Sequence, residues 1–348
     1  MSPLTDPDRV KTPALRPSEQ DSMKAIVQDK YGSPDVLELQ QIGKPVVKDG
    51  EVLVRVQAAS AHAGDGHVMR GLPYLLRLIA RSAGFGLLRP KHRVRGMDVA
   101  GHVEAVGKDV KKFAPGDEVF GWCSGAFAEY VAVSEDALVL KPANLTFEQA
   151  ATVPTSAFGA LQGLRDRGQI QPGQKVLIIG ASGGVGTFAV QIAKSFGADV
   201  TGVCSTSNVE MVRAIGADQV IDYTREDFAR TGQRYDLILD TVGKGSLSDC
   251  RRALTRKGTL VLVAGSGGRW FGGVGRWMRA LLLSPFVGQK LGPLSSKPRK
   301  EDLQFVKELI EEGKVAPVID GTYPLSETAE AIRHIEEGHT QGKVVITV

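Results

Sequence analysis

Cysteine is scarce in this sequence, and its scarcity excludes two kinds of small domain. The 348 residues contain three cysteines, Cys123, Cys204 and Cys250, and none of them lies near another along the chain. Cysteines so far apart form neither a disulfide framework nor the paired ligands of a structural zinc site. We therefore expect a protein of a reducing compartment, and the predicted location is cytoplasmic.

Long apolar runs are also missing, which argues against a membrane-spanning protein. No stretch approaches the ~20 consecutive apolar residues that a spanning helix needs. The N-terminal residues are polar and rich in proline, and they lack the apolar region of a secretory signal. We therefore expect residues 1–22 to form a disordered tail, and Met23 to open the first strand.

Acidic residues are missing from one long segment. Residues 251–300 contain eleven Lys or Arg and no Asp or Glu, although the formal net charge of the whole chain is only +4. So modest an overall charge does not indicate general nucleic-acid binding, and we expect no nucleic-acid partner.

Part of this basic segment has the pattern of an amphipathic helix. Its apolar residues at helical spacing are Val274, Trp277, Met278 and Leu281. Three interpretations stay open for residues 269–286: a cap over a substrate cleft, a surface packed in a homodimer, or a peripheral membrane contact.

The rhythm of the sequence changes once along the chain. Residues 23–150 contain short apolar or alternating runs between turn signals, as in a barrel-like or rolled sheet. Over residues 151–317, strands alternate with helices, which predicts an α/β domain with a doubly wound parallel sheet. Residues from about 318 to 348 end in a strand that returns either to the first domain or to the edge of the second sheet.

The most informative stretch is residues 176–186, which read Val-Leu-Ile-Ile-Gly-Ala-Ser-Gly-Gly-Val-Gly. An apolar run typical of a buried strand ends in a glycine-rich loop, and a helical pattern follows. Glycines let the backbone approach a pyrophosphate closely, and the N-terminus of the next helix offers N–H groups and a favourable dipole. We therefore predict a dinucleotide site that contains Gly180, Ser182, Gly183, Gly184, Val185 and Gly186.

Further motifs accompany this loop. They lie at residues 96–107, 115–121, 125–130, 215–218 and 342–345. Their order resembles the medium-chain dehydrogenase/reductase superfamily, and within it the zinc-free quinone oxidoreductase branch, which includes zeta-crystallin-like and reticulon-interacting-protein-like reductases. The resemblance covers nearly the whole chain. It implies an N-terminal GroES-like β-rich domain, a Rossmann domain and an active site in the cleft between them.

The same resemblance implies that zinc is absent. Zinc-dependent relatives place a Cys in the loop that follows residues 51–59, a His after the glycine that corresponds to Gly96, and a Cys near Thr152. In this sequence residues 60–65 contain no Cys, Met97 follows Gly96, and no cysteine lies near Thr152. Because zinc needs three or four such ligands, we expect no metal site.

The second predicted strand of the Rossmann domain ends without an acidic residue. Sites that prefer NAD place Asp or Glu there to bind the ribose 2′-hydroxyl. Here Cys204 is followed by Ser205, Thr206 and Ser207, whose small donors suit a 2′-phosphate. We therefore expect NADPH rather than NADH. The resemblance adds three cofactor-binding residues: Thr155 near the nicotinamide, Tyr223 near the adenosine, and Gly265 lining the cofactor.

Three residues of the expected cleft are candidates for proton donation, His62, Asp65 and Tyr74. Quinone reductases commonly have Asn where this chain has His62, followed three residues later by Asp. A histidine can donate a proton near neutral pH, although it can equally be a hydrogen-bonded structural residue. Asp65 could hold the loop in place.

We therefore expect NADPH-dependent hydride transfer to a quinone or an α,β-unsaturated carbonyl, for which the protein positions the nicotinamide and excludes water. Two alternatives stay open. A 2-enoyl thioester reductase would need a site for the CoA phosphates, which residues 251–300 could supply. An NADPH-binding interaction or regulatory protein would bind the cofactor without turnover. Because similar reductases are often dimers, we also expect a homodimer.

Overall fold

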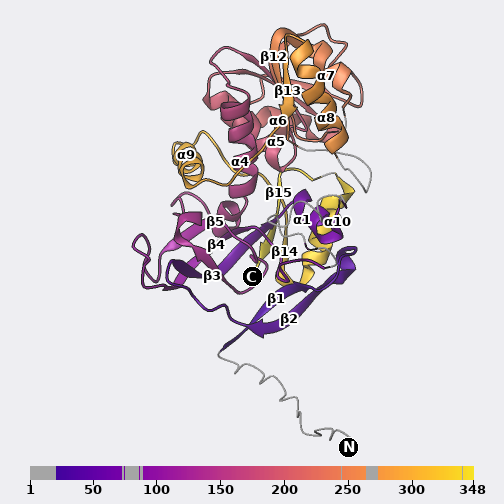
Figure 1. Ribbon diagram of the computed structural model, residues 1–348. Coiled ribbons are helices and arrows are strands. Elements are labelled where there is room, and N and C mark those ends of the chain that lie inside the picture. The colour runs from indigo at the N-terminus through magenta and orange to yellow at the C-terminus, as the bar shows by residue number, and fades with distance from the viewer. Residues whose placement is uncertain are drawn as a thin grey trace, which may run out of the picture.

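The computed structural model describes residues 21–72, 74, 86, 89–243, 245–263, 273–338 and 340–348. Figure 1 shows two halves, with β1 to β5 at the lower end of the molecule and β12 and β13 at the upper end. Of the predicted tail, only Asp21 and Ser22 are described. Because Ser22 already belongs to β1 (Ser22–Gln28), regular structure begins one residue earlier than predicted.

The lower half is the predicted β-rich unit. Its seven-stranded sheet has the order β14-β15-β3-β4-β5-β7, with β6 paired to β3, and a second small sheet joins β1 to β2 (Leu37–Gly43). The strands of the large sheet are β3 (Glu51–Ala61), β4 (Asp98–Val106), β5 (Glu118–Trp122), β6 (Tyr130–Ser134), β7 (Leu138–Leu140), β14 (Ile319–Pro324) and β15 (Lys343–Thr347). Along β3, Val52, Val54 and Val56 are buried at every second position, as in a strand with one face on the core.

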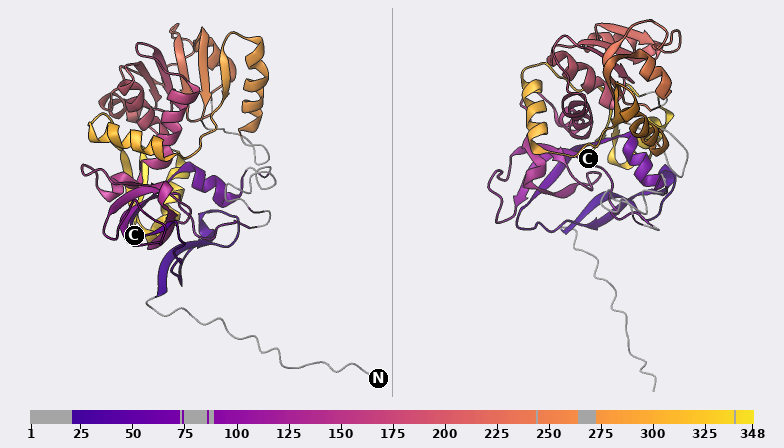
Figure 2. Two further views of the ribbon diagram at one scale, coloured as in Figure 1. Left: turned by 60° about the vertical axis from the view of Figure 1, so that its left-hand side comes forward. Right: turned by 45° about the horizontal axis from the view of Figure 1, so that its top comes forward.

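The C-terminal strands belong to the lower sheet. β15 pairs antiparallel with β3, with Val345 opposite Ser60, and β14 pairs with β15. Both views in Figure 2 show this yellow segment running into the purple half of the molecule. The chain therefore crosses to the upper half and comes back, and α10 (Thr328–Glu337) contacts α1 (Ala63–Arg70) of the lower half.

The upper half is a doubly wound sheet. Its six parallel strands have the order β10-β9-β8-β11-β12-β13. They are β8 (Lys175–Ile179), β9 (Asp199–Cys204), β10 (Gln219–Asp222), β11 (Tyr235–Asp240), β12 (Leu254–Leu262) and β13 (Lys290–Pro293). The predicted doubly wound parallel sheet is therefore confirmed. Its edge strand β13 gives little strand signal in the sequence, because Gly292 and Pro293 are poor strand formers.

Each face of this sheet has its own core. Val176 and Ile178 of β8 pack on one face with α4 (Pro154–Leu161), α5 (Gly184–Ser195) and α9 (Lys300–Glu311). Leu177 and Ile179 of the same strand pack on the other face with α7 (Leu247–Ala253) and α8 (Val274–Leu283). Burial on both faces explains why β8 reads as a continuous apolar run.

The amphipathic helix of the basic segment exists, but its predicted face is divided. Trp277 of α8 packs against the core beneath the sheet, whereas Met278 and Leu281 are about half exposed. Arg276 pairs with buried Asp240 instead of facing solvent. The four apolar residues therefore do not form one outward surface. The N-terminal part of the segment, residues 264–272, lies outside the described residues and includes the predicted cofactor residue Gly265.

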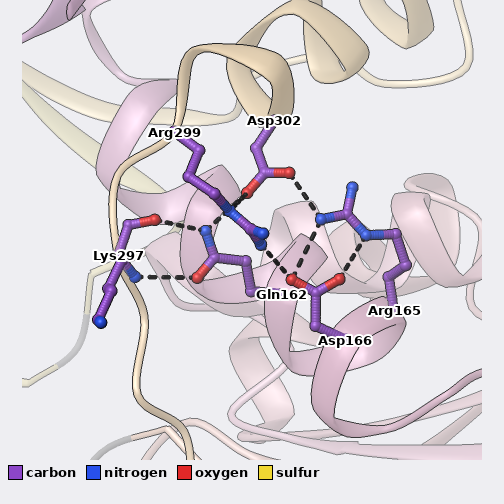
Figure 3. A network of polar contacts seen from close by, with 6 residues as sticks. All are labelled: Gln162, Arg165, Asp166, Lys297, Arg299 and Asp302. Carbon is purple, nitrogen blue, oxygen red and sulfur yellow. Dashed lines mark hydrogen bonds and ion pairs between the residues drawn. The ribbon is translucent and has the colours of Figure 1, made fainter.

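A polar network fixes α9 to the π-helix η5 (Gln162–Arg167) that continues α4. Figure 3 shows its six members: Gln162, Arg165, Asp166, Lys297, Arg299 and Asp302. Buried Asp302 accepts hydrogen bonds from Arg165 Nη2 at 2.6 Å and from Gln162 Nε2 at 2.7 Å. Because Arg165 and Arg299 both bind Asp166 as well, the two helices are held by shared charges. The network is a structural tie far along the chain from the predicted cleft loop.

Candidate active site

The glycine-rich loop after β8 requires glycine at two positions. Gly180 has φ +82°, in the left-handed region, and a Cβ there would lie 2.4 Å from Val242 Cγ2. A Cβ on Gly186 would lie 2.0 Å from the carbonyl oxygen of Gly180. The loop and the first turn of α5 therefore pack backbone against backbone, and no side chain fits between them.

The next part of this loop is open, as a pyrophosphate site requires. A Cβ on Gly183 would meet only the Gly180 carbonyl oxygen, at 3.6 Å, so the surface over this glycine is clear of protein. Gly183 is also the N-cap of α5 and supplies no side-chain cap. The first N–H groups of α5, with the positive end of its dipole, are thus left to an anion. These residues fit the diphosphate of a dinucleotide, with Ser182, Gly184 and Val185 beside it.

The predicted ribose-binding residues follow β9 and are tied to the glycine-rich loop. Asn208 is buried, and its Nδ2 donates to Ser182 Oγ at 3.0 Å and to Ser205 Oγ at 3.2 Å. Ser205 and Ser207 lie within hydrogen-bond distance of each other, and Ser207 is exposed. The serines are therefore held at the carboxyl end of the sheet beside the pyrophosphate loop. The sequence analysis missed the role of Asn208 because only the fold brings it to Ser182.

An acidic side chain reaches this place from the neighbouring strand. Asp222 ends β10 and lies beside Cys204 in the sheet register, so its carboxylate stands next to the β9 loop. Asp222 Oδ2 accepts from Thr206 Oγ1 at 2.6 Å, and its Oδ1 accepts from the N–H and hydroxyl of Thr224. The hydrogen bond from Thr206 holds the pKa of Asp222 below its usual range. With these acceptors occupied, Asp222 organises the loop, and Thr206 turns toward the carboxylate. Next to it, Tyr223 is well exposed, and its place near the adenosine stays a prediction.

Thr155 is fixed by a carboxylate of the lower half. Asp98 is fully buried in β4, and its Oδ1 accepts hydrogen bonds from both the N–H and the Oγ1 of Thr155, at 3.1 and 2.5 Å. Asp98 Oδ2 accepts from Ser60 Oγ at 3.1 Å. Thr155 thus stands at the start of α4, where the upper half meets the lower one. Its place beside the nicotinamide stays a prediction.

The predicted proton donors His62 and Asp65 lie together at the start of α1. His62 is the N-cap, its N–H donates to Asp65 Oδ2 at 3.0 Å, and its Nε2 lies 3.6 Å from the same oxygen. His62 Nε2 and Asp65 Oδ1 are both buried without a hydrogen-bond partner among the described residues. Tyr74 is half-buried beyond the end of α1. The catalytic roles of all three stay predictions.

Two further charged residues join this cluster, and the sequence analysis did not name them. Lys343 opens β15, and its ammonium lies 3.7 Å from Asp98 Oδ2. Arg95 is buried, which lowers its pKa, while the charge of Asp65 opposes that shift. Lys343 Nζ and Arg95 Nε also have no hydrogen-bond partner within the described part of the chain. The cluster therefore holds four buried polar atoms that a bound molecule could satisfy.

The positions that carry zinc ligands in zinc-dependent relatives have no such side chains here. Thr152 is fully buried, and its hydroxyl donates to the carbonyl of Gln149. Across the described ranges, no three His, Cys, Asp or Glu side chains come together as a metal ion would require. Burial raises the pKa of Cys204 to about 11 and of Cys250 to about 12, so both thiols stay protonated near neutral pH.

Two family models match most of the chain between them. The model of an alcohol dehydrogenase GroES-like domain matches residues 48–143, in the lower half, and the model of a zinc-binding dehydrogenase matches residues 215–346. Among the described residues, no helix is both long and apolar enough to cross a membrane.

Curated relatives extend the match to both halves. The human mitochondrial NAD(P)H oxidoreductase RTN4IP1 is 35% identical over 94% of this chain and 89% of its own length. The chloroplastic NADPH-dependent alkenal/one oxidoreductase of Arabidopsis thaliana is 35% identical over 93% of this chain and 79% of its own length. The quinone oxidoreductase of Coxiella burnetii has a similar structure, with a TM-score of 0.83 and 30% identity over 94% of this chain and 99% of that chain. The chain therefore belongs to the medium-chain dehydrogenase/reductase superfamily, in its quinone oxidoreductase branch, and is an oxidoreductase that uses a nicotinamide cofactor.

Proposed function

We propose that this oxidoreductase takes NADPH, needs no zinc and transfers hydride to quinones or α,β-unsaturated carbonyls. The observation that carries the proposal is the pairing of an open pyrophosphate loop with a buried cluster that contains His62, Asp65, Asp98 and Lys343 but no metal-binding group among the described residues. The names of the relatives, which specify alkenal/one and quinone reduction, support the same acceptor class.

When bound, NADPH supplies the hydride, and the residues of this chain bind the cofactor, position it and deliver the proton. The N–H groups of α5 bind the diphosphate, and the Asp98–Thr155 pair lies where the nicotinamide end of the cofactor would reach the lower half. A quinone or enone that accepts a hydride also takes up one proton at its oxygen or α-carbon. His62 Nε2, which is buried and without a partner in the described structure, is the atom we assign to that proton.

The proposal is tested by NADPH oxidation at 340 nm against a panel of acceptors: benzoquinone, phenanthrenequinone, a long-chain ubiquinone, an enone, crotonyl-CoA and an aldehyde. We expect turnover of quinones or the enone that a metal chelator leaves unchanged. Aldehyde reduction that the chelator abolishes would refute the zinc-independent mechanism. Tight NADPH binding without turnover of any acceptor would instead favour an interaction or regulatory protein.

Reduction of 2-enoyl thioesters stays the alternative, and it would need a site for the phosphates of CoA. A surface hollow of about 380 Å³ is lined by Arg251, Arg252 and Arg256, whose guanidinium groups suit phosphates. It lies at the amino ends of β12 and β13, opposite the edge of the sheet that carries the glycine-rich loop. If crotonyl-CoA is the preferred acceptor and its phosphates reach this hollow, R256Q should raise its KM and leave the KM of the enone unchanged. Equal effects on both acceptors would exclude this hollow as a CoA site.

We attribute the preference for NADPH to the loop that follows β9. A negative charge placed in this loop should therefore shift the preference from NADPH toward NADH. In Ser205→Glu, a carboxylate would stand where we place the 2′-phosphate and would repel it, whereas the ribose hydroxyls of NADH could donate hydrogen bonds to that carboxylate. We expect the KM of NADPH to rise about 30-fold or more, the equivalent of about 2 kcal/mol, and the KM of NADH to stay the same or fall. Steady-state kinetics with both cofactors measures the change.

The matched control for this substitution is Ser205→Ala, which removes the hydroxyl without adding charge. It should weaken NADPH binding less than Ser205→Glu does, because it removes one hydrogen bond to the phosphate, worth about 1.5 kcal/mol, but adds no repelling charge. Equal losses for NADPH and NADH in Ser205→Glu would mean that Ser205 does not face the 2′ position.

We also propose that the face of α8 and the turn after it is covered by a second copy of the chain. Leu282 and Phe286 are 65% and 86% exposed, and they lie beside β13, the edge strand of the upper sheet. An edge strand with an apolar neighbour favours self-association over solvent exposure. L282E/F286E should convert a dimer to a monomer in sedimentation velocity, whereas V46E, at an equally exposed apolar site in the lower half, should not.

The competing occupant of this face is an anionic membrane, since Arg279 of α8 and Lys290 of β13 are both exposed. A wild-type monomer that floats with phosphatidylserine vesicles, and whose flotation L282E/F286E abolishes, would replace the dimer by a membrane contact. The cytoplasmic location is likewise a proposal, supported by three free cysteines, and cell fractionation tests it.

A further inference from the structure

Lys343 lies where three parts of the active site meet. It directly follows Gly342, whose N–H donates to the Ser182 carbonyl in the glycine-rich loop at 2.8 Å. Its Cδ would be 2.9 Å from a Cβ on Gly184, so the side chain passes directly beneath the first residue of α5. Only 2% of Lys343 is exposed. The pyrophosphate loop therefore rests on the aliphatic part of this side chain.

The ammonium of Lys343 lies near the carboxylate of Asp98, which holds Thr155 in place. It lies 3.7 Å from Asp98 Oδ2, while Asp98 Oδ1 receives both hydrogen bonds from Thr155. Asp98 is fully buried and would be an isolated charge without a cation. Within the described part of the chain, Lys343 is the one cation at ion-pair distance from Asp98, and it comes from the opposite end of the sequence.

The geometry is not that of a purely structural ion pair. At 3.7 Å the pair lies beyond hydrogen-bond distance, and Lys343 Nζ has no other hydrogen-bond partner among the described residues. A structural pair of buried charges normally satisfies its donors, because each unmet donor costs free energy. The Lys343 ammonium therefore compensates the charge of Asp98 and keeps N–H groups that a bound ligand could accept from.

We propose that Lys343 is a positioning residue for hydride transfer: its ammonium compensates the buried Asp98 carboxylate, which in turn fixes Thr155 at the nicotinamide end of the site. This inference rests on the proposed function, since it assigns Lys343 a part in the same reaction. It goes beyond that proposal in naming what connects the C-terminal strand to the cofactor site.

Several charged groups surround this pair and enter its pH dependence. Burial lowers the pKa of Lys343, and the charges of Asp98 and Asp65 oppose that shift. Burial also raises the pKa of Cys123, and the negative charge of Asp98 adds to that effect. The charge of Asp65 acts on the pKa of Arg95, and no ion pair joins Arg95 to Asp98 in the described structure, so Arg95 does not replace Lys343 as the compensating cation.

The test is a cycle of three variants: Lys343→Met, Asp98→Asn and the double variant. Methionine keeps the unbranched shape under Gly184 but removes the charge, so Asp98 becomes an uncompensated buried carboxylate whose pKa rises. We expect kcat of Lys343→Met to fall about 30-fold or more at pH 8 with little change in the KM of NADPH. It should recover as the pH drops from 8 to 6, because a protonated Asp98 needs no cation and its carbonyl oxygen can still accept from Thr155. The wild type should not show this recovery at acidic pH.

The double variant distinguishes positioning from packing. The amide oxygen introduced by Asp98→Asn can still accept from Thr155 and needs no cation. At pH 8 the double variant should therefore be at least tenfold more active than Lys343→Met, and its kcat should not depend on pH between 6 and 8. A double variant no more active than Lys343→Met would overturn the inference. So would a Lys343→Met enzyme whose pH profile matches the wild type.

Two further measurements are needed. The first tests the coupling of Asp98 and Lys343 independently of any enzymatic activity, and the second tests whether removing any buried lysine has the same effect. The free energy of unfolding of the cofactor-free variants, measured in urea at pH 6 and 8, should show coupling between positions 98 and 343 even if no acceptor is turned over. Lys141→Met is the control, because the Lys141 side chain is only 6% exposed but pairs with Glu118. It should lower stability without changing the pH profile of kcat, and an equal change in that profile would refute a specific role for Lys343.

Discussion

Replacing Gly186 with alanine should abolish tight NADPH binding and destabilise the upper half of the protein. The new Cβ would lie 2.0 Å from the Gly180 carbonyl oxygen and 2.8 Å from backbone atoms of Ala181. Because all of these are backbone atoms, the strain cannot be relieved by a side-chain rotation, and α5 must move away from β8. We expect a loss of about 2–3 kcal/mol in the free energy of unfolding, as for other overpacked cores.

The effect on binding should be larger than the effect on stability. The N–H groups of α5 would no longer converge on the diphosphate, and their geometry determines most of its binding. We expect the Kd of NADPH to rise at least about 100-fold, measured by the fluorescence of the bound nicotinamide. An affinity within a few-fold of the wild type would show that the diphosphate lies elsewhere.

Two other glycines provide matched controls. In Gly183→Ala the Cβ has room in the protein, so stability should stay unchanged while NADPH binding weakens about tenfold or more, because the methyl group would occupy the approach to the diphosphate. In Gly275→Ala, inside α8, a Cβ would meet nothing within 4 Å. That variant should gain up to about 1 kcal/mol from helix propensity and bind NADPH normally.

The cofactor loop could be predicted from the sequence because its determinants are local. An apolar strand, four closely spaced glycines and a helix lie within about twenty residues, and the fold keeps them adjacent. Asp98 and Lys343 lie within the motifs at residues 96–107 and 342–345, but nothing local to them assigned either a role, and Arg95 lies just outside the first motif. Each is separated by many residues from its partners, and only the return of β15 to β3 brings Lys343 beneath the loop.

The basic segment shows a different limit of sequence reasoning. Helical spacing located α8 correctly, but it could not say which of two apolar faces is covered. Trp277 packs against Leu262 and Leu291 on the sheet and shields these apolar residues from water, whereas Met278 stays about half exposed. The same limit applies to Arg276, which a charge count places in a basic surface and the fold places on Asp240.

Loss of the Arg276 charge should strongly lower the free energy of unfolding. Asp240 ends β11 fully buried, and its Oδ1 accepts from the N–H groups of Val242 and Gly243, at 3.1 and 2.8 Å. Its Oδ2 accepts from Arg276 Nη1 at 2.6 Å, and the Arg276 side chain is only 13% exposed. Removing one partner of such a pair leaves an uncompensated buried charge, so Arg276→Met should lose about 3–5 kcal/mol in urea unfolding.

The same helix supplies the control for this prediction. Arg279 is exposed on α8, so Arg279→Met makes the identical change without touching Asp240, and we expect it to alter stability by less than about 0.5 kcal/mol. The double variant Arg276→Met/Asp240→Asn should recover part of the loss, since a neutral amide oxygen can still accept from Val242 and Gly243. If Arg276→Met and Arg279→Met cost the same, the pair does not stabilise the fold. A third outcome is also informative: Arg276→Met costs more stability than Arg279→Met, but the double variant is no more stable than Arg276→Met. The Arg276 side chain would then act through its packing against Cys250, which its Nη2 contacts at 3.6 Å, and not through its charge.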